Sequence, residues 1–287
     1  MDQHTTGYRN LTGTQLRTAA FFDLDRTLIG GSATFTVAVQ ARNAGLISVR
    51  RLLRGAVIAS VFQVVGAGDG ASDKIRQRVL QSVAGTRQSD LQALNEKVLP
   101  RLLERIRPEA QQQLDRHQNF SRDTFIISAA PQEIVGPLAE ALGMTGGIGT
   151  RGAVADGRYT GELESSFCYG PVKRSVVDEL AATHGYDLQR CFAYSDSISD
   201  LPMLEAVGFP VAVNPDFKLG RHSRNMKWPV IKFQSRTKET VRVCAASFGK
   251  LMRYFRSSFG RSQQRQQNLS KLYRFFNYRV LQVGRAV

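Results

Sequence analysis

Cysteine is scarce in this chain, and long hydrophobic runs are missing. The three cysteines, Cys168, Cys191 and Cys244, are widely spaced and form no CxxC pair, which argues against a disulfide framework. We therefore expect free thiols in a reducing compartment. The apolar stretch Gly55–Gly68 is shorter than the roughly 20 residues that a membrane-spanning helix requires. It predicts a buried or interfacial helix instead.

Acidic residues are almost missing from the C-terminal part. Residues 235–287 hold twelve lysines or arginines against one acid, Glu239, and carry most of the net charge of +15. The chain before them is near neutral. Apolar residues from Leu269 onward recur at helical spacing, which predicts a basic amphipathic helix within a C-terminal extension, residues 234–287.

The N-terminus lacks the basic-then-apolar order of a secretory signal. Its residues are mostly polar, so we expect a flexible segment over residues 1–18. A cytoplasmic location is therefore the default expectation.

Short apolar runs alternate with helical patterns through the middle of the chain. The runs are TAAFF before Asp23, Thr124–Ser128, Cys191–Ser195 and Phe209–Val213, with helical segments such as PQEIVGPLAEALG and KRSVVDELAATHG between them. Alternating strands and helices predict an α/β fold with a doubly wound, Rossmann-like parallel sheet. The segment Val154–Leu163 contains an Asp-Gly turn signal and predicts a hairpin.

Nearly a hundred residues separate the first two expected strands. They are rich in helix formers, and a connection of that length rarely lacks structure of its own. We therefore predict a catalytic core over residues 19–32 and 119–233, with a helical cap inserted over residues 33–118.

Two carboxylates follow the first strand. Asp23 and Asp25 are two residues apart, which in a strand places them on one face, at the edge where α/β sheets bind ligands. Their repulsion is relieved by a bound cation or by a proton on one of them. The alternative is a pair of solvated loop acids, which Thr27 and the preceding apolar run make less attractive.

Further polar residues follow the later strands. Asp196 stands where a hard cation would accept a carboxylate oxygen, and Asp200, before Leu201-Pro202, also suits a helix N-cap. Ser128 and the amide of Ala129 would face an anion at a helix N-terminus. Lys173 could balance phosphate charge. Taken alone, a serine in the place of Ser128 is more often only a helix cap, and a lysine beside Arg174 ordinarily lies at the surface.

Taken in order, FFDLDRTL, FIISAA, Lys173 and YSDSISDLPML resemble the four motifs of the haloacid dehalogenase superfamily. The resemblance covers residues 19–233 and points to subfamily IB, which includes phosphoserine phosphatases. It implies a magnesium-dependent phosphomonoester hydrolase.

The resemblance also implies the roles of the site residues. Asp23 would be the nucleophile that forms an aspartyl phosphate, and Asp25 the general acid and base. The implied phosphate-binding residues are Thr27, Ser128, Ala129 and Lys173. The implied Mg²⁺ ligands are Asp23, Asp25 through its backbone carbonyl, Asp196 and Asp200, the last directly or through water.

Two departures from the family pattern concern the metal motif and the substrate. Ser195, Ser197 and Ser199 stand where glycines and an Asn are usual, although serines can still donate hydrogen bonds. Ser32 stands nine residues after Asp23, where phosphoserine phosphatases carry a Glu that binds the substrate's amino group. This argues against phosphoserine and leaves a small or a lipid phosphate monoester as the expected substrate.

The basic C-terminal extension admits two interpretations of equal weight. It could bind an anionic membrane surface peripherally, at the inner face of the membrane, or pack its apolar stripe on the core. A protein acting mainly as a membrane or nucleic-acid binder is the alternative to an enzyme. No nucleic-acid-binding motif is present in the sequence, so nucleic-acid binding is disfavoured.

Overall fold

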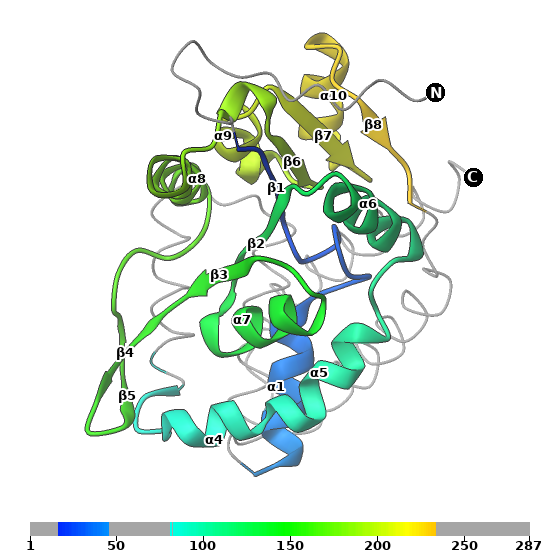
Figure 1. The fold of residues 1–287 in the computed structure, drawn as a ribbon. Coiled ribbons are helices and arrows are strands. Elements are labelled where there is room, and N and C mark those ends of the chain that lie inside the picture. Colours follow the sequence, from blue (N-terminus) through cyan, green and yellow to red (C-terminus); the bar gives the residue numbers. More distant parts are fainter. Residues whose placement is uncertain (1–16, 46–80, 82, 234–287) are drawn as a thin grey trace, which may run out of the picture. The chain divides into compact units, whose positions relative to one another are not determined.

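A parallel β-sheet forms the centre of the part of the chain that the structure describes (Figure 1). The computed structural model describes residues 17–45, 81 and 83–233, so Gly55–Gly68, Cys244 and the extension 234–287 lie outside the described residues. The six strands lie in the order β3-β2-β1-β6-β7-β8, and every neighbouring pair is parallel. The predicted doubly wound α/β fold is therefore confirmed.

The strands of the sheet are β1 (Ala19–Phe22), β2 (Asp123–Pro131), β3 (Gly146–Thr150), β6 (Phe192–Ser195), β7 (Phe209–Val213) and β8 (Val230–Ile231). The helices are α1 (Ala33–Asn43), α4 (Gln88–Ala93), α5 (Asn95–Leu103), α6 (Pro108–Asn119), α7 (Gln132–Ala141), α8 (Pro171–His184), α9 (Leu201–Leu204) and α10 (Phe217–Asn225). Two short 3-10 helices, η1 (Leu188–Arg190) and η2 (Ile198–Asp200), flank β6.

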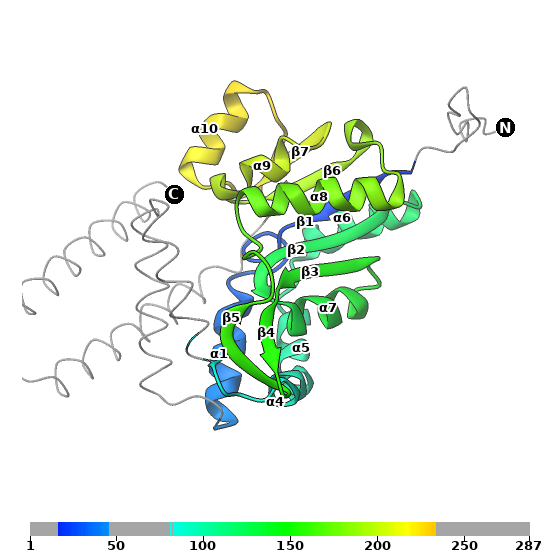
Figure 2. The same cartoon turned by 90° about the vertical axis from the view of Figure 1, so that its left-hand side faces the viewer.

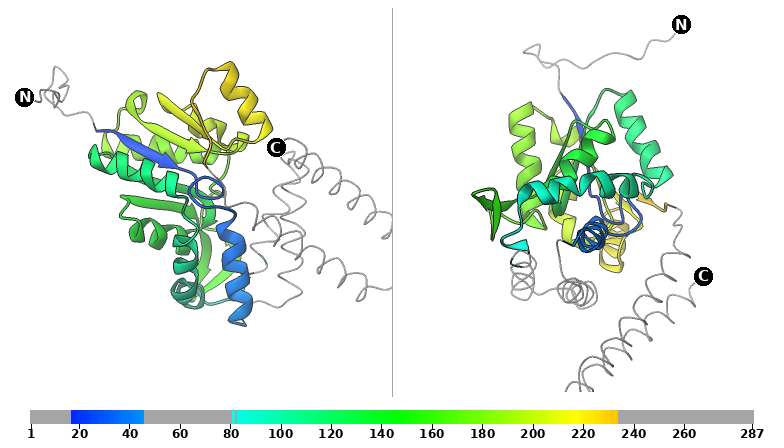
Figure 3. Two further views of the ribbon diagram at one scale, coloured as in Figure 1. Left: turned by 90° about the vertical axis from the view of Figure 1, so that its right-hand side faces the viewer. Right: turned by 90° about the horizontal axis from the view of Figure 1, so that it is seen from below.

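The side chains of β1 alternate between two hydrophobic cores. Ala20 and Phe22 pack on the side that carries α6 and α7, whereas Ala19 and Phe21 pack on the side that carries α8. Figure 3 shows α6 and α8 on opposite faces of the sheet. A strand covered on both faces must be apolar throughout, which explains the continuous run AAFF and its complete burial.

The structure contains two strands that the sequence analysis did not predict, and one strand is longer than predicted. β3 is rich in glycine because α7 packs closely on it: a Cβ at Gly147 would lie 2.5 Å from the carbonyl oxygen of Val135. β8 has only two residues. β2 extends three residues beyond the predicted Thr124–Ser128, with a register shift before Pro131.

A separate antiparallel hairpin, β4 (Gly152–Ala155) and β5 (Arg158–Leu163), confirms the predicted Asp-Gly turn. Asp156 and Gly157 both have positive φ. The chain before α4 runs beside β5, where the Gly85 amide donates to Tyr159 O and the Tyr159 amide donates to Thr86 O. Figure 2 shows the hairpin beside α4.

Helices from the predicted cap pack in two places. α1 and α5 pack on each other, and α5 also packs on α7. α6 falls within the predicted cap, residues 33–118, but packs against β2, so its packing places it with the sheet. Among the described helices, none is both long enough and apolar enough to cross a bilayer. Cys168 and Cys191 are buried free thiols, as predicted.

Candidate active site

The predicted acidic residues gather at the carboxyl edge of the sheet. Asp23 follows β1 and Asp196 follows the adjacent strand β6, and the amide of Asp23 donates to Tyr194 O at 2.9 Å. Parallel strands end at the same edge, so their following residues meet there. Asp23 and Asp196 are both buried.

A buried lysine joins two of these acids. Lys173, in the first turn of α8, places Nζ 2.6 Å from Asp23 Oδ1 and 2.8 Å from Asp200 Oδ2. The Ser195 hydroxyl also donates to Asp200 Oδ2, at 2.7 Å. The predicted N-cap role of the Asp200 side chain is therefore wrong. It makes no cap hydrogen bond to α9, because the ammonium and the hydroxyl hold it toward the site.

Burial and charge shift the pKa values of this cluster. Burial alone would lower the pKa of Lys173, but the carboxylates of Asp200 and Asp23 outweigh it and raise that pKa, so the ammonium is retained. Burial raises the pKa of Asp23 to about 6, against the attraction of Lys173. Burial also raises the pKa of Asp196 to about 8, despite Arg26 and with a contribution from Asp23. Three buried carboxyl groups, those of Asp23, Asp196 and Asp200, thus share this site, and a bound cation would offset the cost of keeping them ionised.

Arg26 pairs with Asp196. Its Nε lies 2.8 Å from Asp196 Oδ2, and its side chain is about half exposed. Arg26 has a φ of 64°, a left-handed conformation in the tight turn that follows Asp25. That turn is closed by the amide of Arg26, which donates to Gly31 O.

Asp25 is held at both carboxylate oxygens. The Ser32 hydroxyl donates to Oδ2 at 2.8 Å, and the Ala33 amide donates to Oδ1 at 2.7 Å. Burial raises the pKa of Asp25, while these two hydrogen bonds oppose the change. Asp25 is partly exposed.

The predicted phosphate-binding residues lie at the same edge. Thr27 Oγ1 is buried and has no hydrogen-bond partner within the part of the chain that the structure describes. Ser128 is buried, and its Oγ accepts from the Ala130 amide at 3.1 Å. The carbonyl of Ala129 accepts from the Thr150 hydroxyl at 3.0 Å, which fixes the end of β2 after Ser128. The unpaired Thr27 hydroxyl suits an incoming oxyanion.

Two buried acids of the site, Asp23 and Asp196, have the donor chemistry that a magnesium ion binds. Lys173 binds Oδ1 of Asp23, and Arg26 binds Oδ2 of Asp196, so both acids present carboxylate oxygens at the site. Mg²⁺ prefers such hard oxygen ligands. No set of three His, Cys, Asp or Glu side chains among the described residues is arranged to hold a metal. Asp200, which was also predicted as a metal ligand, accepts hydrogen bonds from Lys173 and Ser195 instead.

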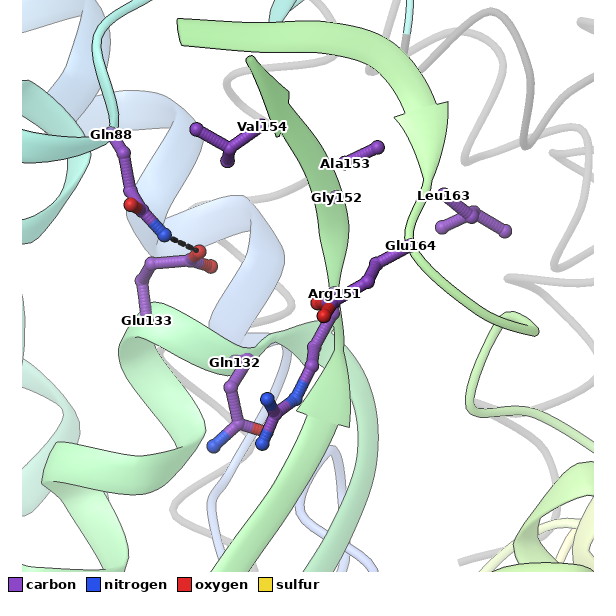
Figure 4. Close-up of a pocket in the computed structure, with 9 residues that line it drawn as sticks. All are labelled: Gln88, Gln132, Glu133, Arg151, Gly152, Ala153, Val154, Leu163 and Glu164. Carbon is purple, nitrogen blue, oxygen red and sulfur yellow. Dashed lines mark hydrogen bonds between the residues drawn. The ribbon is translucent and has the colours of Figure 1, made fainter. Parts of the chain in front are cut away.

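A polar pocket of about 520 Å³ lies over α7 and the β4-β5 hairpin (Figure 4). Its lining comprises Gln88, Gln132, Glu133, Arg151, Gly152, Ala153, Val154, Leu163 and Glu164. None of the predicted catalytic side chains lines it. Gln132 follows Ser128 by four residues, and Arg151 follows Thr150, whose hydroxyl binds Ala129 O. Two lining residues, Gln132 and Arg151, therefore lie close along the chain to the predicted phosphate-binding residues Ser128 and Ala129 or to their partner Thr150.

Several contacts at the site were not predicted from the sequence. The hydrogen bond from Ser32 to Asp25 depends on the turn that follows β1, which the local sequence pattern does not define. Asp216 was not singled out, although its Oδ2 accepts from the Ile198 amide at 2.9 Å and from the Ser197 hydroxyl at 3.2 Å. The Asn-Pro-Asp sequence before α10 is an N-cap signal that could have identified it.

Comparison with known proteins identifies the family. The model of the haloacid dehalogenase-like hydrolase family matches residues 20–205. The chain belongs to this family. A probable phosphatase of Mycobacterium tuberculosis is 40% identical to the chain over 223 residues, which cover 77% of each protein. A phosphoserine phosphatase of the same organism is 33% identical over 225 residues, 76% of this chain and 72% of the relative.

A solved structure has a similar fold. A protein of unknown function from Bordetella pertussis Tohama I has a TM-score of 0.66 and 25% identity, covering 75% of this chain and 98% of its own. The predicted family and its phosphoserine-phosphatase-like branch are confirmed, and the chain is a phosphoric monoester hydrolase.

Proposed function

We propose that this phosphatase is magnesium-dependent and acts through an aspartyl phosphate on Asp23. The observation that carries the proposal is the placement of Asp23 at the carboxyl edge of the sheet, with one oxygen held by the buried ammonium of Lys173 at 2.6 Å. The ammonium orients the carboxylate and leaves Asp23 Oδ2 to react. With a pKa of about 6, Asp23 is ionised at neutral pH, as a nucleophile must be.

The first half-reaction would form the acyl phosphate. Asp23 Oδ2 attacks phosphorus as the bond from phosphorus to the ester oxygen breaks, and that oxygen keeps the electron pair. Protonated Asp25 donates its proton to the departing oxygen, so an alcohol leaves. The Thr27 hydroxyl, Ser128 and the Ala129 amide would bind the phosphoryl oxygens, together with Lys173.

The second half-reaction would release phosphate. Asp25, now a carboxylate, takes a proton from water as the water oxygen attacks phosphorus. The bond to Asp23 then breaks and the carboxylate is regenerated, with Asp25 protonated for the next cycle.

The magnesium ion would be held by the carboxylates of Asp23 and Asp196 and by the backbone carbonyl of Asp25. Asp200 would support this site indirectly, because it binds Lys173 and Ser195. When bound, the ion offsets the negative charge that otherwise keeps a carboxylate from an anionic phosphate.

The substrate we favour is a small phosphate monoester of a polar alcohol. The pocket whose lining includes Gln132 and Arg151 has a volume of about 520 Å³, which suits a small molecule. It presents the carboxylates of Glu133 and Glu164 and the guanidinium of Arg151, which match a hydroxyl- or amine-bearing leaving group better than an acyl chain. The lipid-phosphate and membrane predictions depend on Gly55–Gly68 and the extension 234–287, outside the described residues.

Phosphate release tests the proposal. The panel is phosphoserine, phosphoethanolamine, sugar phosphates, lysophosphatidate and p-nitrophenyl phosphate, each with Mg²⁺ or with a chelator. We expect release only with Mg²⁺, and none from Asp23→Asn. Asp178→Asn, an exposed acid paired with Arg174, is the matched control and should retain wild-type activity. Release that persists in the chelator, or in Asp23→Asn, would contradict the proposed chemistry.

A further inference from the structure

The turn between Asp25 and α1 is held by a residue from far along the chain. Arg105 donates from Nε and Nη2 to Gly30 O, at 3.0 and 2.6 Å, and from Nη1 to Thr36 Oγ1 at 2.7 Å. Arg105 therefore ties the turn after β1 to the first helical turn of α1. It follows α5 by two residues, where the chain returns from the predicted cap toward the sheet.

Gly31 makes this clamp possible. Its φ is +108°, and a Cβ there would lie 2.2 Å from Arg105 Nη2. Only glycine leaves room for the guanidinium and adopts that backbone conformation without strain. The conformation of the turn and the place of Arg105 thus depend on each other.

The clamp acts on the group that touches Asp25. Thr36 Oγ1 accepts from Arg105 and donates to Ser32 O at 3.1 Å. Arg105 is therefore linked to the backbone of Ser32 through the Thr36 hydroxyl. Ser32 is the N-cap of α1: its Oγ accepts from the Phe35 amide at 3.4 Å and donates to Asp25 Oδ2 at 2.8 Å. The next amide, that of Ala33, binds Asp25 Oδ1.

We propose that Ser32 and Arg105 are positioning residues that hold the Asp25 carboxyl in the orientation for proton transfer. The inference rests on the proposed role of Asp25 as general acid and base. Two hydrogen bonds, one to each oxygen, fix the plane of the carboxyl group, and each oxygen keeps a second lone pair for the proton. Ser32 thereby serves the acid at the position where the phosphoserine phosphatases carry a substrate-binding Glu.

The dependence of rate on the leaving group distinguishes positioning of the acid from general damage. An acidic phenol leaves with little help, whereas a weakly acidic phenol must receive a proton as its bond breaks. The probe is a series of aryl phosphates of similar shape, from p-nitrophenyl to p-methoxyphenyl phosphate, with Mg²⁺. The quantity measured is kcat/KM, which includes the first bond cleavage but excludes hydrolysis of the intermediate.

We expect Ser32→Ala to lower kcat/KM for p-methoxyphenyl phosphate about 10- to 100-fold more than for p-nitrophenyl phosphate. Asp25→Asn should show the same pattern more strongly. Ser32→Thr keeps the hydroxyl and the cap, so it should restore most of the loss. Thr34→Ala removes an exposed hydroxyl from the same turn of α1 and should match the wild type.

Arg105→Lys provides the second variant if loss of the N-cap unfolds Ser32→Ala. A lysine can replace one of the three hydrogen bonds of Arg105, so we expect a smaller change of the same kind. Arg101→Lys, exposed in the last turn of α5, is its control. Equal losses on all aryl phosphates would overturn the inference while leaving the proposed function intact. Absence of Mg²⁺-dependent turnover in the wild type would instead refute the proposed function.

Discussion

Replacement of Lys173 by methionine should destabilise the protein strongly at neutral pH. The methionine keeps the apolar stem but removes the ammonium that lies 2.6 Å from Asp23 and 2.8 Å from Asp200. Removing one partner of a buried ion pair costs about 3 to 5 kcal/mol, because the other charge stays buried and unpaired. Uptake of a proton by the acids limits that cost, so we expect about 3 kcal/mol at pH 7.5 with a chelator present.

The stability lost in Lys173→Met should be smaller at acidic pH. Burial already raises the pKa of Asp23 to about 6, and loss of Lys173 removes the attraction that opposes this rise. A carboxyl group whose pKa is higher in the folded than in the unfolded protein destabilises the fold as pH rises above the unfolded pKa, and the penalty is complete above the folded pKa. The penalty is relieved as pH falls and the folded protein takes up the proton. The deficit of Lys173→Met should therefore be smaller at pH 5.5 than at pH 7.5.

Urea unfolding at the two pH values measures this effect. The matched control is Arg174→Ala, the adjacent residue, whose pair with Asp178 is exposed and spaced i,i+4. Such pairs contribute only about 0.5 kcal/mol or less. A loss for Lys173→Met that is no larger than the loss for Arg174→Ala would refute the account of the buried cluster. So would a loss of equal size at both pH values.

Three further predictions concern other parts of the structure. Burial, with the charges of Arg122 and Arg116, lowers the pKa of His117 from 6.5 to about 4. About 3 kcal/mol of unfolding free energy should thus be lost as pH falls from 6.5 to 4, and His117→Gln should flatten this dependence in urea titrations. Gly208→Ala should lower the free energy of unfolding by about 2 kcal/mol in the same urea titrations, because the added Cβ would lie 1.9 Å from Gln189 O. A urea midpoint equal to that of the wild type would contradict this. Asp196→Asn should raise the Mg²⁺ concentration for half-maximal activity at least about tenfold, and an unchanged value would remove Asp196 from the metal site.

The sequence was sufficient to predict the sheet edge that carries the site. Asp23 and Asp196 each follow a buried apolar run, and parallel strands bring such positions together whatever the connections between them. β3 was missed because its glycines look like a loop, although they are required by the close approach of α7. Strand propensity cannot reveal a requirement that arises from packing.

The support of Asp25 could not be predicted from local sequence. It depends on a hydrogen bond between Arg105 and Gly30, residues 75 positions apart, and on the conformation of Gly31. The Asp200 side chain illustrates the same limit. Its position before Leu201-Pro202 suggested a helix cap, but a buried ammonium 27 residues away binds it instead.

Direct detection of the phosphorylated residue tests the central claim. The protein is mixed with Mg²⁺ and p-nitrophenyl phosphate, quenched during the first turnovers, and treated with borohydride, which reduces an acyl phosphate of aspartate to homoserine. Mass spectrometry of the peptides then locates the modified residue. We predict homoserine at position 23 and neither modification nor turnover in Asp23→Asn. Modification of another residue, or wild-type turnover by Asp23→Asn, would contradict the account.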